Sequence, residues 1–162
     1  MIESKLPSRK HPRLKNYDYS QNGYYFVTIC CHNDLNFFGG VGRGLAPATK
    51  VINLSARGKI AEEQLLLLEK RYTSIKIDKY IIMPNHIHAI IVIDSNEMAG
   101  ASPRPTLSDI ICAFKSLTTR ECNKLDNVKG RKIFQTSFYD SVLTNPKAYE
   151  NAWLYIDGNA NK

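Results

Sequence analysis

The sequence of 162 residues has no apolar run that approaches the ~20 residues of a membrane-spanning helix. The segment from Met1 to Lys15 lacks the apolar centre of a secretory signal. The four cysteines include no Cys-x-x-Cys pair, which argues against a zinc ribbon or a dithiol redox centre. We therefore expect a cytoplasmic protein with no membrane partner, in which the cysteines stay reduced and serve as small apolar residues.

A functional nucleotide-binding loop is also missing. The glycines of residues 39–44 superficially resemble a Gly-x-Gly-x-x-Gly motif, but their spacing is wrong and no Gly-Lys-Ser/Thr follows them. No helix is predicted to start there, so we interpret residues 39–48 as a flexible loop. The sequence contains no internal repeat.

The composition fits a globular protein, with 43% hydrophobic and 23% charged residues. The length favours one domain over residues 1–162. The formal net charge of +7 points to a polyanionic partner, although a basic protein without such a partner is the alternative. We predict that residues 1–15 form a flexible basic arm. The arm either contacts DNA phosphates or is a solvated tail. The candidate phosphate contacts are Arg9, Lys10, Arg13 and Lys15.

Hydrophobic periodicity predicts four strands and three helices. The strands are expected at residues 24–31, 75–83, 87–93 and 137–143, with Pro84 and Asn85 as a hairpin turn between the second and the third. The helices are expected at residues 54–72, 107–124 and 146–157, with Ser55 and Thr106 as the N-caps of the first two and Gly158 ending the last one. The order is β-α-β-β-α-β with an added C-terminal helix, which predicts a ferredoxin-like α+β fold with an antiparallel sheet.

The third predicted strand carries two histidines, His86 and His88, within an otherwise apolar run. Side chains alternate between the two faces of a strand, so the two imidazoles point the same way. Burying two polar rings side by side is costly unless both have partners. The pattern therefore favours a metal site, and a pair of hydrogen-bonded core histidines is the alternative.

The last predicted helix carries a phenol and an amide on one face. Four residues at helical spacing form its core-facing stripe: Tyr149, Ala152, Trp153 and Ile156. Tyr155 lies to the side of this stripe, and Asn159 follows it by one helical turn. Tyr155 is therefore free of an obligatory core role, although a boundary aromatic is the common interpretation of such a residue.

Together these motifs resemble the REP-associated tyrosine transposases, which belong to the single-tyrosine HUH family and act on single-stranded DNA with repetitive palindromic elements. The resemblance rests on Met-Pro-Asn-His-x-His at residues 83–88 and on Tyr155 with Asn159. It extends to residues 13–19, 23–28 and 135–140 and so covers nearly the whole chain. Family members usually have Asn-Pro where this chain has Asn159 followed by alanine.

The resemblance implies an enzyme that nicks single-stranded or hairpin DNA and transfers the strand. His86, His88 and Asn159 would hold a divalent ion, Mg or Mn, and Tyr155 would form a 5′-phosphotyrosine. Relatives include monomers and homodimers that exchange the tyrosine helix. Lys115 and Arg120, on the flanks of a predicted helix, are expected to join the basic arm in binding DNA.

Three other functions are consistent with parts of the pattern. RNA-recognition modules share the β-α-β-β-α-β order, but their Lys/Arg-Gly-Phe/Tyr-Gly/Ala-Phe motif is missing here. A domesticated transposase would bind DNA hairpins without cutting them. A structural zinc protein would combine His86 and His88 with a cysteine.

Overall fold

The computed structural model describes residues 14–43, 50–96 and 104–159. Its main sheet has four antiparallel strands in the order β4-β5-β1-β6. These strands are β1 (Gly23–Cys30), β4 (Ile75–Ile82), β5 (His86–Ile93) and β6 (Tyr139–Leu143). The helices are α1 (Ala56–Arg71), α2 (Leu107–Leu125) and α3 (Pro146–Asn159). The predicted ferredoxin-like order with an added C-terminal helix is confirmed.

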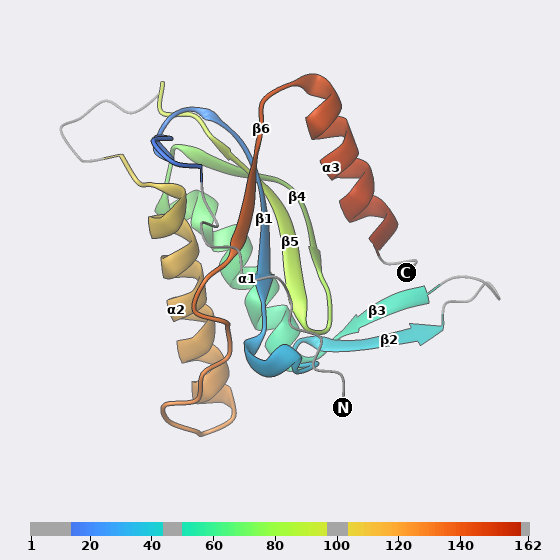
Figure 1. The fold of residues 1–162 in the computed structure, drawn as a ribbon. Coiled ribbons are helices and arrows are strands. Elements are labelled where there is room, and N and C mark those ends of the chain that lie inside the picture. Colours follow the sequence, from blue (N-terminus) through green and yellow to red (C-terminus); the bar gives the residue numbers. More distant parts are fainter. Residues whose placement is uncertain (1–13, 44–49, 97–103, 160–162) are drawn as a thin grey trace, which may run out of the picture.

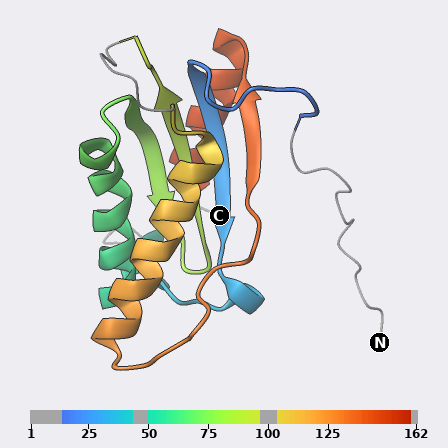
Figure 2. The ribbon, with the colours of Figure 1, turned by 90° about the vertical axis from the view of Figure 1, so that its left-hand side faces the viewer.

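Helices α1 and α2 cover one face of the sheet, and α3 packs on the other (Figures 1 and 2). Alternation along the strands explains the division. In β1, Tyr25, Val27 and Ile29 are fully buried, while Tyr24 and Phe26 point to the opposite face, where they contact tyrosines of α3. The sheet thus has a closed apolar face and a second face with polar side chains.

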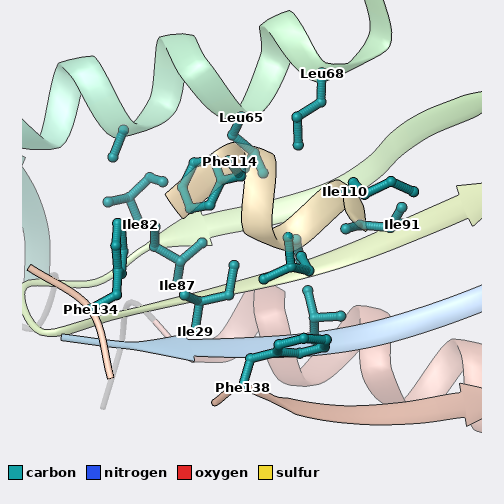
Figure 3. Close-up of a cluster of buried hydrophobic side chains, with 14 of the residues drawn as sticks. Ile29, Leu65, Leu68, Ile82, Ile87, Ile91, Ile110, Phe114, Phe134 and Phe138 are labelled. Carbon is teal, nitrogen blue, oxygen red and sulfur yellow. The ribbon is translucent and has the colours of Figure 1, made fainter. Parts of the chain in front are cut away.

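The apolar core fills the space between the sheet and the helices α1 and α2 (Figure 3). It is built from branched aliphatic residues of the strands and from larger side chains of the helices. Ile87 and Ile91 of β5 meet Leu65 of α1 and Phe114 of α2 in this layer. Burying each of these side chains contributes about 1.5–3 kcal/mol. Along β5, His86 and His88 alternate with the buried Ile87. Packing of the isoleucines in the core therefore fixes the two histidines on the opposite face of the sheet.

Both core helices begin at the capping residues that the sequence predicts. The Ser55 hydroxyl accepts a hydrogen bond from the Gly58 amide at 3.1 Å. Thr106 and Asp109 form a reciprocal capping box, in which each side chain accepts from the backbone of the other. Such caps satisfy amide groups that have no partner within the helix.

The prediction of a flexible loop over residues 39–48 is wrong for its first part. Strand β2 (Gly39–Arg43) pairs antiparallel with β3 (Lys50–Leu54), and the two form a separate ribbon (Figure 1). In the sequence this ribbon follows β1 and precedes α1. Pairing with a partner strand overrides the low strand propensity of glycine. Residues 44–48 lie outside the described part of the chain.

Three predicted boundaries also need correction. Leu54 ends β3 and does not begin the helix, because Ser55 caps α1. The last strand starts at Tyr139, two residues later than expected. Gly158 does not end α3, which continues to Asn159. No helix within the described residues is long and apolar enough to span a membrane.

Candidate active site

The strand that carries both histidines starts at a tight turn. Pro84 and Asn85 form this turn between β4 and β5, closed by a 2.8 Å hydrogen bond from the Met83 amide to the His86 carbonyl. The turn is fixed from outside as well, since Cys31 donates its amide to the Asn85 carbonyl and Phe38 donates to the Pro84 carbonyl. The predicted hairpin turn is therefore confirmed, and it holds His86 at the first position of a central strand.

The imidazoles of His86 and His88 lie together on the face that α3 covers. Their ring centroids are 4.6 Å apart with an interplanar angle of 72°. Each Nδ1 atom has a hydrogen-bond partner, which is Asn85 Oδ1 at 2.6 Å for His86 and Thr28 Oγ1 at 2.9 Å for His88. A hydrogen bond at Nδ1 fixes the orientation of an imidazole and leaves Nε2 as the atom that can coordinate a metal.

Burial lowers the pKa of His86, and the negative charge of Asp34 opposes this effect. The neutral imidazole is therefore favoured in the folded protein. Only the neutral form can coordinate a metal, so this environment suits a ligand.

Helix α3 places the Tyr155 phenol directly against the histidine pair. The ring of Tyr155 lies 5.2 Å from that of His88, edge to face, and 5.9 Å from that of Phe26. Tyr155 remains 44% exposed, so a substrate can reach it. The sequence alone predicted a tyrosine beside the core-facing stripe, and the structure brings it against His88, which lies 67 positions earlier in the chain.

Contacts with β4 and its bulge hold α3 in this position. Lys79 of β4 forms a 2.8 Å ion pair with Asp157 and lies 3.6 Å from the centre of the Trp153 ring. The Tyr149 hydroxyl donates a 2.6 Å hydrogen bond to Asp78, where the register of β4 shifts. These contacts flank Tyr155 on the helix and restrict its position relative to the sheet.

Asn159, the third expected ligand, is buried at the end of α3. None of the described residues accepts a hydrogen bond from its Nδ2 atom. A buried amide atom without a partner is costly, and a flip of the side chain would place the oxygen there instead. The buried amide thus has an atom that could meet a ligand, and coordination of a metal together with His86 and His88 stays a prediction.

The cysteine-containing zinc site finds no support. Cys30 pairs with His86 across β1 and β5, so it is the nearest cysteine in register. Burial raises the pKa of its thiol, which favours the protonated form and weakens it as a ligand. In the part of the chain that the structure describes, no three His, Cys, Asp or Glu side chains come together as a metal site.

The structure describes only some of the residues predicted to bind DNA. Arg9, Lys10 and Arg13 lie outside the described residues, and Lys15 is exposed. Lys115 donates hydrogen bonds of 2.9 Å to the carbonyls of residues 135 and 137. The Arg120 side chain is 70% exposed beside Glu121. DNA binding by all six residues stays a prediction.

Thr28 and Asn85 are site residues that the sequence did not identify as such. Asn85 was interpreted as part of the turn and of the motif at residues 83–88, and Thr28 as part of the first strand and of the family resemblance, neither with a role at the histidines. Thr28 reaches His88 because β1 and β5 pair in the register that sets these two residues opposite each other. No local pattern encodes that register.

Comparison with solved structures identifies the fold. A REP-associated tyrosine transposase bound to a REP hairpin aligns with a TM-score of 0.59, at 17% sequence identity, over 91% of this chain and 71% of that one. The chain has the fold of the REP-associated tyrosine transposases. A candidate transposase from Deinococcus radiodurans shares this transposase fold, with a TM-score of 0.51 and 12% identity over 90% of this chain and 95% of that one.

Sequence comparisons do not identify a family for this chain. An uncharacterized protein of Haemophilus influenzae is 26% identical over 165 residues, covering 93% of this chain and 87% of that protein. No family model matches the sequence. The transposase fold is therefore established by structure, while the chemistry has to be argued from the site.

Proposed function

We propose that this protein is a transposase that nicks single-stranded or hairpin DNA through Tyr155 and transfers the cut strand. The observation that carries the proposal is the Tyr155 ring 5.2 Å from His88, on a face where His86 and His88 stand side by side. Nothing in core packing requires two imidazoles, of which that of His88 is buried, to meet an exposed phenol. A nucleophile beside a metal-binding pair explains the arrangement.

The reaction exchanges one phosphate ester for another. The Tyr155 oxygen attacks phosphorus, the bond from phosphorus to the 3′ oxygen breaks, and the phenol proton is balanced by the proton gained on the new 3′ hydroxyl. The phosphate stays on the 5′ side of the cut as a phosphotyrosine. Because this ester keeps the energy of the broken bond, rejoining to another 3′ hydroxyl requires no nucleoside triphosphate.

The donor set fits a divalent ion held by His86, His88 and Asn159. Both histidines are oriented through Nδ1, and the buried Asn159 amide has an atom without a protein partner among the described residues. Two imidazoles favour Mn²⁺ over Mg²⁺, although either is proposed. When bound, such an ion polarises a phosphate and offsets the charge that develops in the transition state. A phenol, with a pKa near 10, benefits from a nearby cation.

The proposed substrate is DNA with a hairpin of the REP type. The net charge of +7 supports a polyanionic ligand. The solved transposase with the same fold was captured on a REP hairpin. The alternative function is a domesticated protein that binds DNA hairpins without cutting them. It would share the substrate with the proposed transposase and would lack the cleavage step.

A denaturing-gel assay with a labelled hairpin oligonucleotide and Mn²⁺ or Mg²⁺ tests the proposal. We expect a covalent adduct with the wild type and none with Tyr155→Phe, which removes one oxygen and keeps the ring. His88→Ala should also lose the adduct but retain most of its DNA affinity, because phosphate contacts by many Lys and Arg residues carry binding.

Tyr149→Phe is the matched control on the same helix. Its hydroxyl bonds Asp78 and helps to hold α3, so the adduct should still form, at a reduced rate, because the contacts of Lys79 with Trp153 and Asp157 remain. An adduct that survives in Tyr155→Phe would place the nucleophile elsewhere. Tight hairpin binding with no adduct from any variant, on a substrate that carries the target sequence, would favour the domesticated binding protein.

A further inference from the structure

Three strands of the sheet place a tyrosine, a threonine and a histidine in one row beside the candidate site. Thr28 of β1 pairs with His88 of β5 on one side and with Tyr139 of β6 on the other. Residues directly opposite in an antiparallel sheet share a face. Tyr139 therefore lies on the same face as the histidines, two strand spacings from His88, or about 10 Å at ~4.8 Å per spacing.

On this face α3 reaches β1, where its tyrosines contact Tyr24 and Phe26, and it leaves Tyr139 exposed. The helix packs toward β4, as the contacts of Lys79 with Asp157 and Trp153 show, and Figure 1 shows it on the β4 side of the sheet after it leaves the end of β6. Tyr139 is 44% exposed, and Ser141, the next residue of β6 on this face, is also exposed. A strand of DNA can therefore reach Tyr139 and Ser141, while His88 itself is buried in contact with Phe26 and Tyr155.

The backbone that carries Tyr139 is well anchored. The preceding residue, Phe138, is buried in the core between the sheet and the helices. Lys115 ties the carbonyls of residues 135 and 137 to α2, just before β6 begins. An aromatic ring on such a fixed strand loses little conformational entropy on binding, which is what a stacking platform requires.

We propose that Tyr139 is the stacking platform for a nucleobase next to the scissile phosphate. The inference rests on the proposed function and specifies where its substrate lies, across β1 and β6. A strand position about 10 Å from that of His88 suits the base of a nucleotide adjacent to a phosphate at the candidate site. Stacking on tyrosine is tolerant of base identity, so Tyr139 positions the strand and does not read its sequence.

The test uses full-length protein that carries Tyr155→Phe, so that DNA binds without being cut. The probe is the hairpin oligonucleotide with 2-aminopurine placed in turn at each single-stranded position. We expect quenching at one position when Tyr139 is present, and the same quenching with Tyr139→Phe. Tyr139→Ala should abolish it and weaken single-strand affinity about 5- to 150-fold, the usual effect of removing one stacking residue. Leu66→Ala, an exposed position on α1, is the control and should change neither value.

Tyr139→Leu keeps apolar bulk without a π face and serves as the second variant if Tyr139→Ala unfolds. Quenching and affinity that are unchanged in both substitutions would overturn the proposal. Failure of the nicking reaction is distinguishable, because it appears as a missing adduct in wild-type protein while the Tyr139-dependent quenching persists. Conversely, a wild-type adduct together with an unaltered KM for DNA in Tyr139→Leu would keep the nicking function and exclude the platform.

Discussion

The chemistry proposed for this protein depends on how single side chains hold the two imidazoles. Thr28 and Asn85 each bond the Nδ1 atom of one histidine, so the orientation of both rings is set by these neighbouring side chains. Partners of this kind are commonly worth 10- to 100-fold in metal affinity or activity.

Thr28→Val tests this role for His88. The substitution keeps the β-branched shape that a strand favours and removes the hydroxyl. We expect adduct formation and Mn²⁺ affinity to fall about 10- to 100-fold with little change in melting temperature. Thr28→Ser, which restores a hydroxyl, should recover most of both. Equal activity of the valine and serine variants would show that the hydrogen bond does not orient His88.

Asp126 provides a pH-dependent contribution to stability at the contact between α1 and α2. It bonds Arg57 and Arg131, each at 2.6 Å, and the hydrogen bond from Arg57 is the main cause that lowers its pKa. The unfolded carboxyl keeps its ordinary pKa of 3.8, so this stabilisation is present above that pH and is lost as the pH falls through the lower folded value. Asp126→Asn should therefore flatten the acid side of a plot of unfolding free energy against pH. A curve that stays parallel to the wild type would contradict this assignment.

The elements next to the site are placed by close approach of backbones as well as by side chains. In α1, a Cβ atom added at Gly58 would lie 2.1 Å from the Phe38 carbonyl oxygen. Gly39, at the base of the ribbon, has a φ of +155° and approaches the Asn53 carbonyl in the same way. These glycines let the ribbon and α1 pack where a larger residue would separate them.

Gly58→Ala is expected to destabilise the protein, although alanine is favoured over glycine in helices by about 1 kcal/mol. The clash with a main-chain oxygen cannot be relieved by a side-chain rotation. Gly158→Ala in α3 is the matched control, since no atom lies within 4 Å of its added Cβ, and it should leave stability unchanged or raise it by up to ~1 kcal/mol. Urea unfolding of both variants gives the comparison, and a Gly58→Ala protein as stable as wild type would show that the contact relaxes.

Charge acts over the entire molecule and governs its affinity for DNA. A single-strand complex loses about 0.7 in the slope of log affinity against log salt for each phosphate contact that is removed. The predicted basic arm would supply several such contacts in addition to those of the folded part.

Deletion of residues 1–15 should therefore reduce the magnitude of the salt slope by about 0.7 for each arm residue that contacts a phosphate. Arg120→Gln, a change in an exposed side chain of α2, should reduce it by the same amount if Arg120 also contacts the backbone. The measurement is a titration of hairpin DNA at several salt concentrations. A slope that does not change on deletion would identify the arm as a solvated tail.

The amino-acid sequence was sufficient for the order of the main elements and for the candidates His86, His88 and Tyr155, whose rings the structure brings together. Alternating and helical periodicities are local, so the strand of His86 and His88, the caps at Ser55 and Thr106, and the core stripe of α2 follow from short segments. The ribbon of β2 and β3 was missed, because its strands are defined by pairing and glycine-rich segments carry little strand signal.

Only the tertiary structure decided which side chains meet. Thr28, His88 and Tyr139 lie far apart in the chain and share one row because β1 pairs with β5 and with β6 in particular registers. The approach of Tyr155 to His88 likewise depends on contacts of α3 with Asp78 and Lys79 of β4. Strand register and helix docking are set by the sum of many non-local contacts, and no short segment of the sequence contains that sum.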